Sequence, residues 1–157
     1  MSVIIFGLGS NLGNKKSNIM KAGKLLKKSF GASNFLGSSS LIKTKPLVLN
    51  SSPQVYSRLY YLNSAIAFNV KTPIKLVLKK IKKIEERLGR KKITRWCPRK
   101  IDIDVLIYQN NEIQSSKINI PHKELLNRSF ALIPLIEILD TLKLENDFYK
   151  KALNTLF

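Results

Sequence analysis

The segment from Tyr60 to Gly89, YYLNSAIAFNVKTPIKLVLKKIKKIEERLG, joins a strand pattern directly to a helix pattern. Its first part alternates between two faces, with Leu62, Ser64, Ile66, Phe68 and Val70 on one and Tyr61, Asn63 and Ala65 on the other. Thr72 as N-cap and Pro73 in the first turn predict a helix that ends at Gly89. Its expected buried stripe consists of Ile74, Val77, Leu78, Ile81, Ile84 and Leu88.

The sequence on both sides of this segment completes a regular order of elements. Upstream, we predict a strand at Val3–Leu8, a helix from about Lys15 to a stop at Gly31, and a strand at Phe35–Thr44. Downstream, a basic loop leads to a strand at Ile101–Tyr108. The resulting β-α-β-β-α-β order is the ferredoxin-like plan, so we predict an α/β (α+β) fold with a mainly antiparallel sheet.

The C-terminal part is expected to add to this core. A short strand or turn is predicted near Ile118–Ile120, a helical stretch within residues 122–139, and a small amphipathic helix from about Phe148. A length of 157 residues corresponds to one domain, so we expect residues 1–157 to form a single unit. This plan serves many unrelated functions and cannot assign one by itself.

The composition predicts a cytoplasmic protein. No apolar run approaches the roughly 20 residues of a membrane span, and the N-terminal residues lack the pattern of a signal peptide. Cys97 is the single cysteine, which rules out an internal disulfide framework and is consistent with a reducing compartment.

The net charge of +18 is concentrated in the middle of the chain, where residues 71–100 hold 13 Lys and Arg against 2 Glu. Such a field attracts polyanions, including nucleic acid. The alternative is a compositional bias, because Lys, Ile and Asn are abundant throughout the sequence. The arginines are better candidates for a specific role, since the guanidinium group can bind a phosphate through two hydrogen bonds.

Asp102 and Asp104 follow a strongly basic segment, RKKITRWCPRK at residues 90–100. In a strand, residues two apart point to the same face, so both carboxylates emerge side by side. Ile101, Ile103 and Val105 are expected to be buried on the other face and to fix this register. The pair could hold Mg²⁺ while the cations bind phosphate, or it could simply balance the cations.

The turn GLGSNLG at residues 7–13 has the spacing G-x-G-x-x-x-G, which fits neither a Rossmann fingerprint nor a P-loop. It is either a tight turn in which Ser10 or Asn11 helps to start the helix, or a turn that also lines a ligand site.

Other candidate residues have two interpretations each. Trp96 belongs either to the core or beside a ligand, and Tyr61 with Asn63 suits a flat heterocycle or a buried tyrosine and its partner. A structural or capping role is the ordinary expectation for His122, and a solvent-exposed position is the ordinary expectation for Glu85 and Arg128.

Taken together, these stretches resemble 6-hydroxymethyl-7,8-dihydropterin pyrophosphokinase (HPPK), a family of folate biosynthesis. The most specific match is R-W-x-P-R-x-I-D-x-D at 95–104. The weaker matches occur in the right order, namely G-S-N-L-G at 9–13, Thr44-x-Pro46, Tyr61-Leu62-Asn63, P-H at 121–122 and R-x-F-x-L-x-P-L at 128–135.

The resemblance implies a three-layer α/β/α domain that transfers the β,γ-pyrophosphate of ATP to the pterin hydroxymethyl oxygen and releases AMP. It implies that Asp102 and Asp104 hold two Mg²⁺ ions and that Arg90 and Arg99 bind the phosphates. ATP-site positions of the family fall on Glu85, Lys92, Arg95, Trp96, Arg99, Val105, His122 and Arg128. Pterin-site positions fall on Thr44, Lys45, Leu47, Tyr61, Asn63, Trp96 and Phe130.

The chain departs from the family pattern at Cys97, where a glycine is usual, and at Lys92, where an arginine is common. Lys45 and Lys123 are also more basic than the usual residues. None of these removes an expected metal ligand, so we expect activity, with altered kinetics of the loop.

Two other classes of function remain as alternatives. An RNA-binding protein of ferredoxin-like fold would explain the charge but not the acid pair, and a catalytically idle homologue is disfavoured by Asp102, Asp104, Arg90 and Arg99. We therefore expect ATP and the pterin as partners, neither a membrane nor nucleic acid, a monomer, and dihydropteroate synthase as a pathway neighbour.

Overall fold

The computed structural model describes residues 2–45, 60–89, 99–109, 111–121, 125–144 and 147–156, without the side chains of residues 148, 149, 152, 155 and 156. Its main sheet has the strand order β2-β4-β1-β5, and every pair is antiparallel. The sheet has five strands. Along this path lie β1 (Val3–Ser10), β2 (Phe35–Ser38), β4 (Tyr61–Asn69) and β5 (Asp102–Tyr108), and β3 (Ile42–Thr44) also pairs with β4. This order, with one helix after β1 and one after β4, confirms the predicted ferredoxin-like core.

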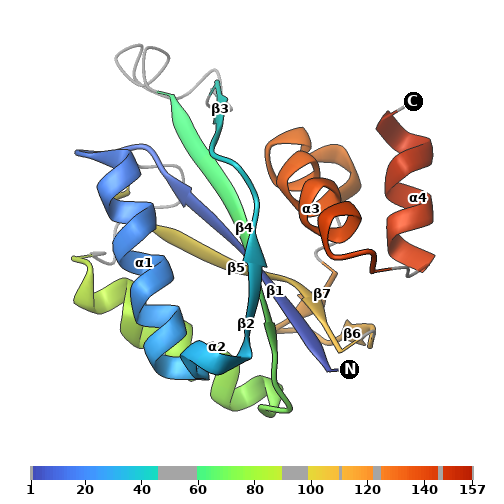
Figure 1. Cartoon of the computed structure of the whole chain (residues 1–157), viewed down its shortest axis with the longest axis horizontal. Coiled ribbons are helices and arrows are strands. Elements are labelled where there is room, and N and C mark those ends of the chain that lie inside the picture. Colours follow the sequence, from blue (N-terminus) through green and yellow to red (C-terminus); the bar gives the residue numbers. More distant parts are fainter. Residues whose placement is uncertain are drawn as a thin grey trace.

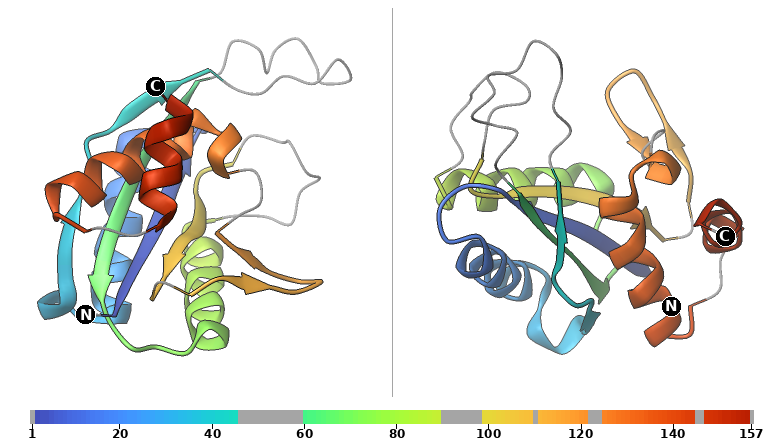
Figure 2. Two further views of the ribbon diagram at one scale, coloured as in Figure 1. Left: turned by 90° about the vertical axis from the view of Figure 1, so that its right-hand side faces the viewer. Right: turned by 90° about the horizontal axis from the view of Figure 1, so that it is seen from above.

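Helices cover both sides of the sheet, as Figures 1 and 2 show. α1 (Lys15–Phe30) and α2 (Ile74–Arg87) lie on one side. α3 (Ser129–Thr141) packs on the other side, and α4 (Asp147–Leu156) packs against α3. The three-layer α/β/α arrangement is therefore present.

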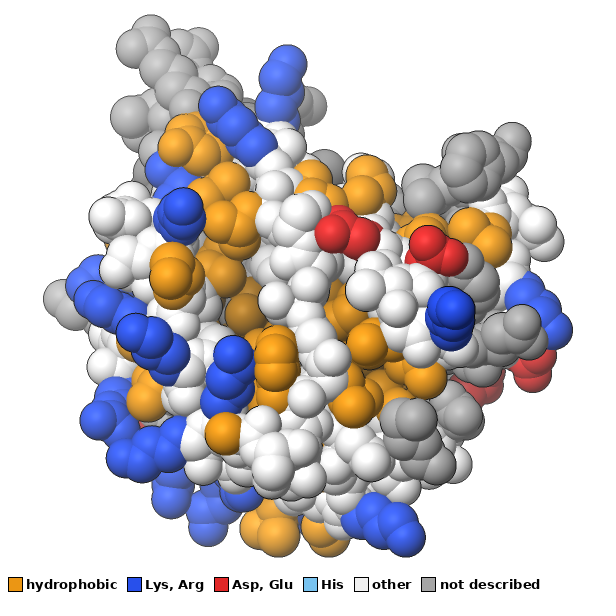
Figure 3. Space-filling model, viewed as in Figure 1, with side chains coloured by type: hydrophobic (Ala, Val, Ile, Leu, Met, Phe, Trp, Pro, Cys, Tyr) orange, Lys and Arg blue, Asp and Glu red, His pale blue; other side chains and the backbone are white. Residues whose placement is uncertain are grey.

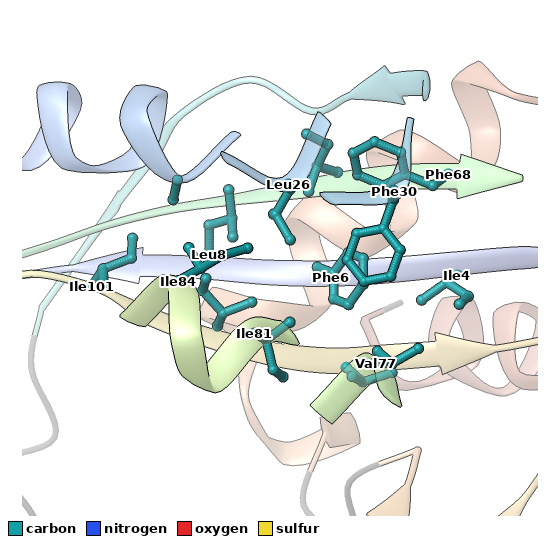
Figure 4. Packing of buried hydrophobic residues seen from close by; sticks show 14 of the residues in the cluster. Ile4, Phe6, Leu8, Leu26, Phe30, Phe68, Val77, Ile81, Ile84 and Ile101 are labelled. Atoms are coloured by element: carbon teal, nitrogen blue, oxygen red, sulfur yellow. The ribbon is translucent and has the colours of Figure 1, made fainter. Parts of the chain in front are cut away.

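The two sides of the sheet have separate cores because strand residues alternate. Ile4, Phe6 and Leu8 of β1 point toward α1 and α2, whereas Ile5 points toward α3. In the α1/α2-side core, the ring centroids of Phe6 and Phe30 lie 5.2 Å apart (Figure 4).

Short elements complete the fold. Among the described residues, 3₁₀ turns lie at Ala32–Asn34 and Leu125–Asn127. A small hairpin pairs β6 (Ile113–Gln114) with β7 (Asn119–Ile120). No helix in the described parts of the chain is both long and apolar enough to cross a membrane.

The predicted strand Phe35–Thr44 is two strands, β2 and β3 (Ile42–Thr44), which both pair with β4. The reason is a local serine contact. Ala65 N–H donates to Ser39 Oγ (2.8 Å), and Ser39 N–H donates to Ala65 O (2.8 Å). A side-chain oxygen thus takes the place of a backbone acceptor and interrupts the ladder.

The starts of both core helices differ from prediction. Asn14, rather than Ser10 or Asn11, caps α1, because its Oδ1 accepts from Ser17 N–H (3.1 Å). Thr72 does not cap α2; Pro73 occupies the N-cap position in an extended conformation, without a side-chain cap. The predicted buried stripe of α2 is confirmed, but Glu85, expected in solvent, is buried at 7% exposure.

Candidate active site

Asp102 and Asp104 lie on the α3 side of the sheet, opposite Gly9 and Gly7 of β1. The neighbouring residues Ile101, Ile103 and Val105 are buried in the α1/α2-side core, as predicted. This burial fixes which way β5 faces, so both carboxylates are directed to one face of the sheet. We call the α3-facing part of the sheet that carries Gly7, Gly9, Asn63, Asp102 and Asp104 the site face.

The centre of the site face lacks side chains because β1 contributes glycines. A Cβ atom on Gly9 would lie 3.1 Å from Asn63 Oδ1, and one on Gly7 would lie 3.2 Å from the Leu106 side chain. Both distances are tighter than ordinary contacts, so the glycines permit the observed packing. They also leave backbone accessible between the acid pair and β4.

Asn63 connects the site face to β3. Its side chain is buried at 6% exposure, and its Nδ2 donates to Thr44 Oγ1 (2.8 Å). This hydrogen bond fixes the orientation of the amide and leaves Oδ1 above Gly9. The family resemblance assigned Thr44, Tyr61 and Asn63 to one pocket. These three residues lie on adjacent positions of β3 and β4.

Tyr61 is a partly buried residue at the start of β4, two positions before Asn63. Burial is the main cause that raises the pKa of its phenol, while the Arg99 guanidinium lowers this pKa and the Asp102 carboxylate raises it. On the site face, Gly9 of β1 pairs with Asn63 on one side and with Asp102 on the other. The residues of β4 and the acids of β5 therefore share one face of the sheet.

Arg99 forms an ion pair with Asp102, with 3.4 Å between Nη1 and Oδ1. Both side chains are partly exposed, at 24% and 32%, so the pair is open to solvent and to a ligand. Such an exposed pair contributes little to stability, which leaves the guanidinium group available for a phosphate.

Asn11 holds the backbone of Arg99, a link that the sequence patterns did not predict. Arg99 N–H donates to Asn11 Oδ1 (2.8 Å), and Asn11 N–H donates to Arg99 O (3.3 Å). Asn11 is itself buried at 4% exposure. The glycine-rich turn at residues 7–13 therefore anchors the residue that begins the approach to β5. This role is compatible with the second interpretation of the sequence, in which the turn at residues 7–13 also lines a ligand site.

Other predicted site residues are less directly placed. Arg128 and Phe130 lie at the start of α3, with the guanidinium carbon 6.0 Å from the ring centroid, and α3 packs against β4 and β1. Lys45 is exposed directly after β3. The side chain of Val105 points into the opposite core, and Glu85 lies in α2 on that other side of the sheet.

Several predictions fall outside the described residues: Leu47, Arg90, Lys92, Arg95, Trp96 and His122. Their roles stay predictions. Within the described residues, no group of three or more His, Cys, Asp and Glu comes together to hold a metal ion. Asp102 and Asp104 are a pair of carboxylates on one face of β5.

A family model described as 7,8-dihydro-6-hydroxymethylpterin-pyrophosphokinase (HPPK) matches residues 5–140. The chain belongs to the HPPK family. A similar protein of Haemophilus influenzae, 2-amino-4-hydroxy-6-hydroxymethyldihydropteridine pyrophosphokinase, is 33% identical over 147 residues, which cover 93% of this chain and 87% of the relative.

Other similar proteins are much longer than this chain. The folate synthesis bifunctional protein of Chlamydia muridarum is 44% identical over 131 residues, which cover 82% of this chain. A protein of the same name from Arabidopsis thaliana is 35% identical over 145 residues, which cover 92% of this chain. The chain spans 28% of the length of each of these two relatives.

Solved structures support the fold. A structure of HPPK-DHPS in complex with substrates has a TM-score of 0.62 at 16% identity and covers 88% of this chain and 40% of its own. The wild-type HPPK-DHPS of Plasmodium falciparum also has a TM-score of 0.62, at 14% identity, and covers 87% of this chain and 41% of its own.

Proposed function

We propose that this chain transfers the β,γ-pyrophosphoryl group of ATP to the hydroxymethyl oxygen of 6-hydroxymethyl-7,8-dihydropterin and releases AMP. Membership of the HPPK family supports the reaction class. The observation that carries the proposal is the position of two carboxylates, Asp102 and Asp104, on the same glycine-lined face as Asn63. An acid pair beside a pocket for a flat ring is what such a transfer requires.

Asp102 and Asp104 would hold two Mg²⁺ ions. The donor set fits, because carboxylate oxygens are preferred ligands of Mg²⁺ and the two side chains share one face of β5. When bound, the ions supply neutralisation of charge on the phosphoryl oxygens. The open ion pair between Arg99 and Asp102 can rearrange as these ligands enter, since both of its partners are partly exposed.

In the transfer, the hydroxymethyl oxygen attacks the β-phosphorus, and the bond from that phosphorus to the oxygen shared with the α-phosphate breaks. AMP leaves with that oxygen, and the hydroxyl proton passes to water. Arg99 binds phosphate oxygens and stabilises their charge, and Arg90 would join it. The chain acts mainly by positioning the two substrates and stabilising charge, rather than through a covalent intermediate.

The pterin would lie over Gly9, between Asn63 and the acid pair. Asn63, held by Thr44, offers its amide to the hydrogen-bonding edge of the ring, and Tyr61 closes one side. Leu47, Lys45, Trp96 and Phe130 would complete the pocket. The ATP site would be formed by residues on the nucleotide side, namely Arg95, Lys92, Trp96, His122, Arg128, Glu85 and Val105. Val105 would contribute through its backbone, because its side chain is buried in the opposite core.

We also propose that residues 1–157 form one pyrophosphokinase domain that acts in the cytoplasm as a monomer. The single cysteine, Cys97, supports a reducing compartment. The bifunctional relatives and the HPPK-DHPS structures support dihydropteroate synthase as the neighbouring activity in the pathway.

The test is AMP release from Mg²⁺-ATP with and without 6-hydroxymethyl-7,8-dihydropterin. We expect AMP only when the pterin is present, and none after EDTA removes the divalent cation. AMP release that does not depend on the pterin, or no AMP from a folded protein that binds Mg²⁺-ATP, would overturn the proposed acceptor.

A further inference from the structure

The positive charge of this chain is distributed very unevenly over its helices. α1 has six lysines and no acid, and α2 has five lysines and an arginine against two glutamates, one of which is buried. In contrast, α3 has no lysine or arginine within its bounds and carries Glu137 and Asp140. Figure 3 shows most Lys and Arg side chains of this view on the side of α1, whereas the acidic side chains lie on the side of α3 together with a few Lys and Arg. A uniform compositional bias would not produce this separation.

Most of the lysines in α1 and α2 point away from the protein. In α1, Lys21, Lys24 and Lys28 are exposed on the side of the helix opposite Ala22 and Leu26, which are fully buried. In α2, Lys79 and Lys83 are exposed opposite the core residues of that helix. We call the following set of exposed residues the lysine face: Lys16, Lys21, Lys24, Lys28, Lys75, Lys79, Lys82 and Lys83.

The two helices present these charges as one surface. α1 and α2 pack side by side, and Lys80 of α2 donates from Nζ to Ser29 O of α1 (2.6 Å). Lys80 therefore makes a contact within the protein. Lys27 does so as well, because its Nζ lies 3.9 Å from the centroid of the Phe35 ring. The members of the lysine face have no such contact among the described hydrogen bonds, ion pairs and ring contacts, so they remain available to a partner.

The lysine face does not serve the site face. The two lie on opposite sides of the sheet, because Asp102 and Asp104 point toward the layer of α3 whereas α1 and α2 cover the other side. The lysine face therefore makes no direct contact with a ligand on the site face and is free to bind a separate anionic partner.

We propose that the lysine face binds double-helical nucleic acid through its phosphates, without reading the sequence. Lysines supply point charges for phosphates, whereas base recognition usually needs arginine or amide side chains. Single strands are disfavoured because they need open aromatic rings for stacking. On this side Phe30 is buried, Lys27 lies over the ring of Phe35, and Lys15 and Lys43 lie over the ring of the exposed Tyr60.

An anionic membrane is a poorer match for this surface. Helices that lie in a membrane interface insert an apolar face, but the apolar residues of α1 and α2 are directed into the core. Of the large hydrophobic residues in the two helices, only Met20 and Leu76 are exposed, at 54% and 50%. A surface with many charges and so little exposed apolar area favours the phosphate backbone of a nucleic acid over a membrane.

The experiment measures binding of the full chain to a mixed-sequence DNA duplex over a series of salt concentrations. Two variants remove two charges each from the lysine face, Lys24→Gln with Lys28→Gln and Lys79→Gln with Lys83→Gln. The matched control removes two exposed charges elsewhere, Lys143→Gln with Lys150→Gln. The slope of log K against log salt is negative, and each lost phosphate contact makes it less steep by about 0.9. We therefore expect each lysine-face variant to reduce its magnitude by nearly twice that amount. The control should keep the wild-type slope.

Three results would overturn the proposal. They are no duplex binding by the wild type at low salt, an equal loss of slope in the control, and tighter binding to anionic vesicles or to a single strand than to the duplex. Because the test needs no turnover, failure of the proposed pyrophosphokinase activity would leave its outcome unaffected. Circular dichroism and thermal unfolding of each variant ensure that a lost slope reflects lost charge rather than lost fold.

Discussion

Asn11 holds both backbone polar groups of Arg99, although the two residues lie 88 positions apart in the sequence. The amide oxygen of Asn11 accepts from the Arg99 N–H at 2.8 Å, and its own N–H donates to the Arg99 carbonyl at 3.3 Å. Because Arg99 also pairs with Asp102, this link positions the guanidinium group beside the acid pair. Asn11 is thus a positioning residue for the proposed phosphate site.

Replacing Asn11 with alanine should lower kcat about tenfold. The change removes the acceptor that holds the Arg99 backbone, so the guanidinium group is less well placed to stabilise charge in the transition state. A loss of about 1.4 kcal/mol of that stabilisation corresponds to a tenfold fall in rate. Steady-state kinetics with saturating ATP and pterin measure the effect. Asn18→Ala is the matched control, because Asn18 supports the same turn through Ser10 and Leu12 but does not reach Arg99. Equal kcat values for the two variants would show that Asn11 acts only on stability.

Replacing Thr44 with valine should raise the KM for the pterin about fivefold with little change in kcat. Valine keeps the shape of the side chain but removes the oxygen that accepts from Asn63 Nδ2 at 2.8 Å. A hydrogen bond of this kind contributes about 0.5–1.5 kcal/mol, and here it orients the amide that we propose binds the ring. Thr44→Ser retains the oxygen and should behave as the wild type. A change in kcat with no change in KM would contradict the assignment of Thr44 and Asn63 to the pterin pocket.

The stability of the protein should fall at alkaline pH partly through Tyr61. Burial raises the pKa of this phenol above the ordinary value of 10.0, so the folded state binds the proton more tightly than the unfolded state. The resulting stabilisation is fully present below pH 10.0 and is lost as the pH rises through the higher folded pKa. Urea unfolding at about pH 9 and about pH 11 should show a smaller loss of free energy of unfolding in Tyr61→Phe than in the wild type. An equal loss in both proteins would contradict the raised pKa.

Replacing Gly23 with alanine should stabilise the protein without changing its activity. Gly23 lies within α1, and an added Cβ would make an ordinary contact of 3.8 Å with Ile66 Cδ1. The expected gain is about 0.5–1 kcal/mol, because alanine loses less backbone entropy than glycine in a helix. Thermal unfolding measures it. Gly9→Ala is the contrasting variant, since its Cβ would lie 3.1 Å from Asn63 Oδ1 and should impair pterin binding. A destabilised Gly23→Ala would mean that the α1/α2-side core cannot accept the methyl group.

The sequence predicted those features that depend on neighbouring residues. The alternation along β4 and the 3.6-residue stripe of α2 set the faces of both elements, so Ile66, Phe68 and Val77 were correctly expected in the core. The common face of Asp102 and Asp104 followed from the same rule. Each of these inferences needs only the geometry of a single strand or helix.

The features that the sequence did not predict depend on contacts between distant segments. The link from Asn11 to Arg99 joins two turns, and the break between β2 and β3 depends on Ser39 meeting Ala65 across the sheet. Local patterns contain no information on such partners, which arise only when the chain has folded. Glu85 is a different case, because its position four residues after the core residue Ile81 was a local signal of burial, and only its charge led to the expectation of an exposed position.

The most direct test of the proposed site compares pterin-dependent AMP formation by the wild type, Asp102→Ala and Asp104→Ala. Both side chains are at least partly exposed on the site face, so both variants should fold normally. Loss of residues that merely support a metal ligand costs about 10–100-fold, so loss of a direct ligand should lower turnover at least about 100-fold. Thermal unfolding provides the control for folding. A fall of this size in both folded variants is the predicted result, and near-normal turnover in either one would contradict the assignment of the acid pair to Mg²⁺.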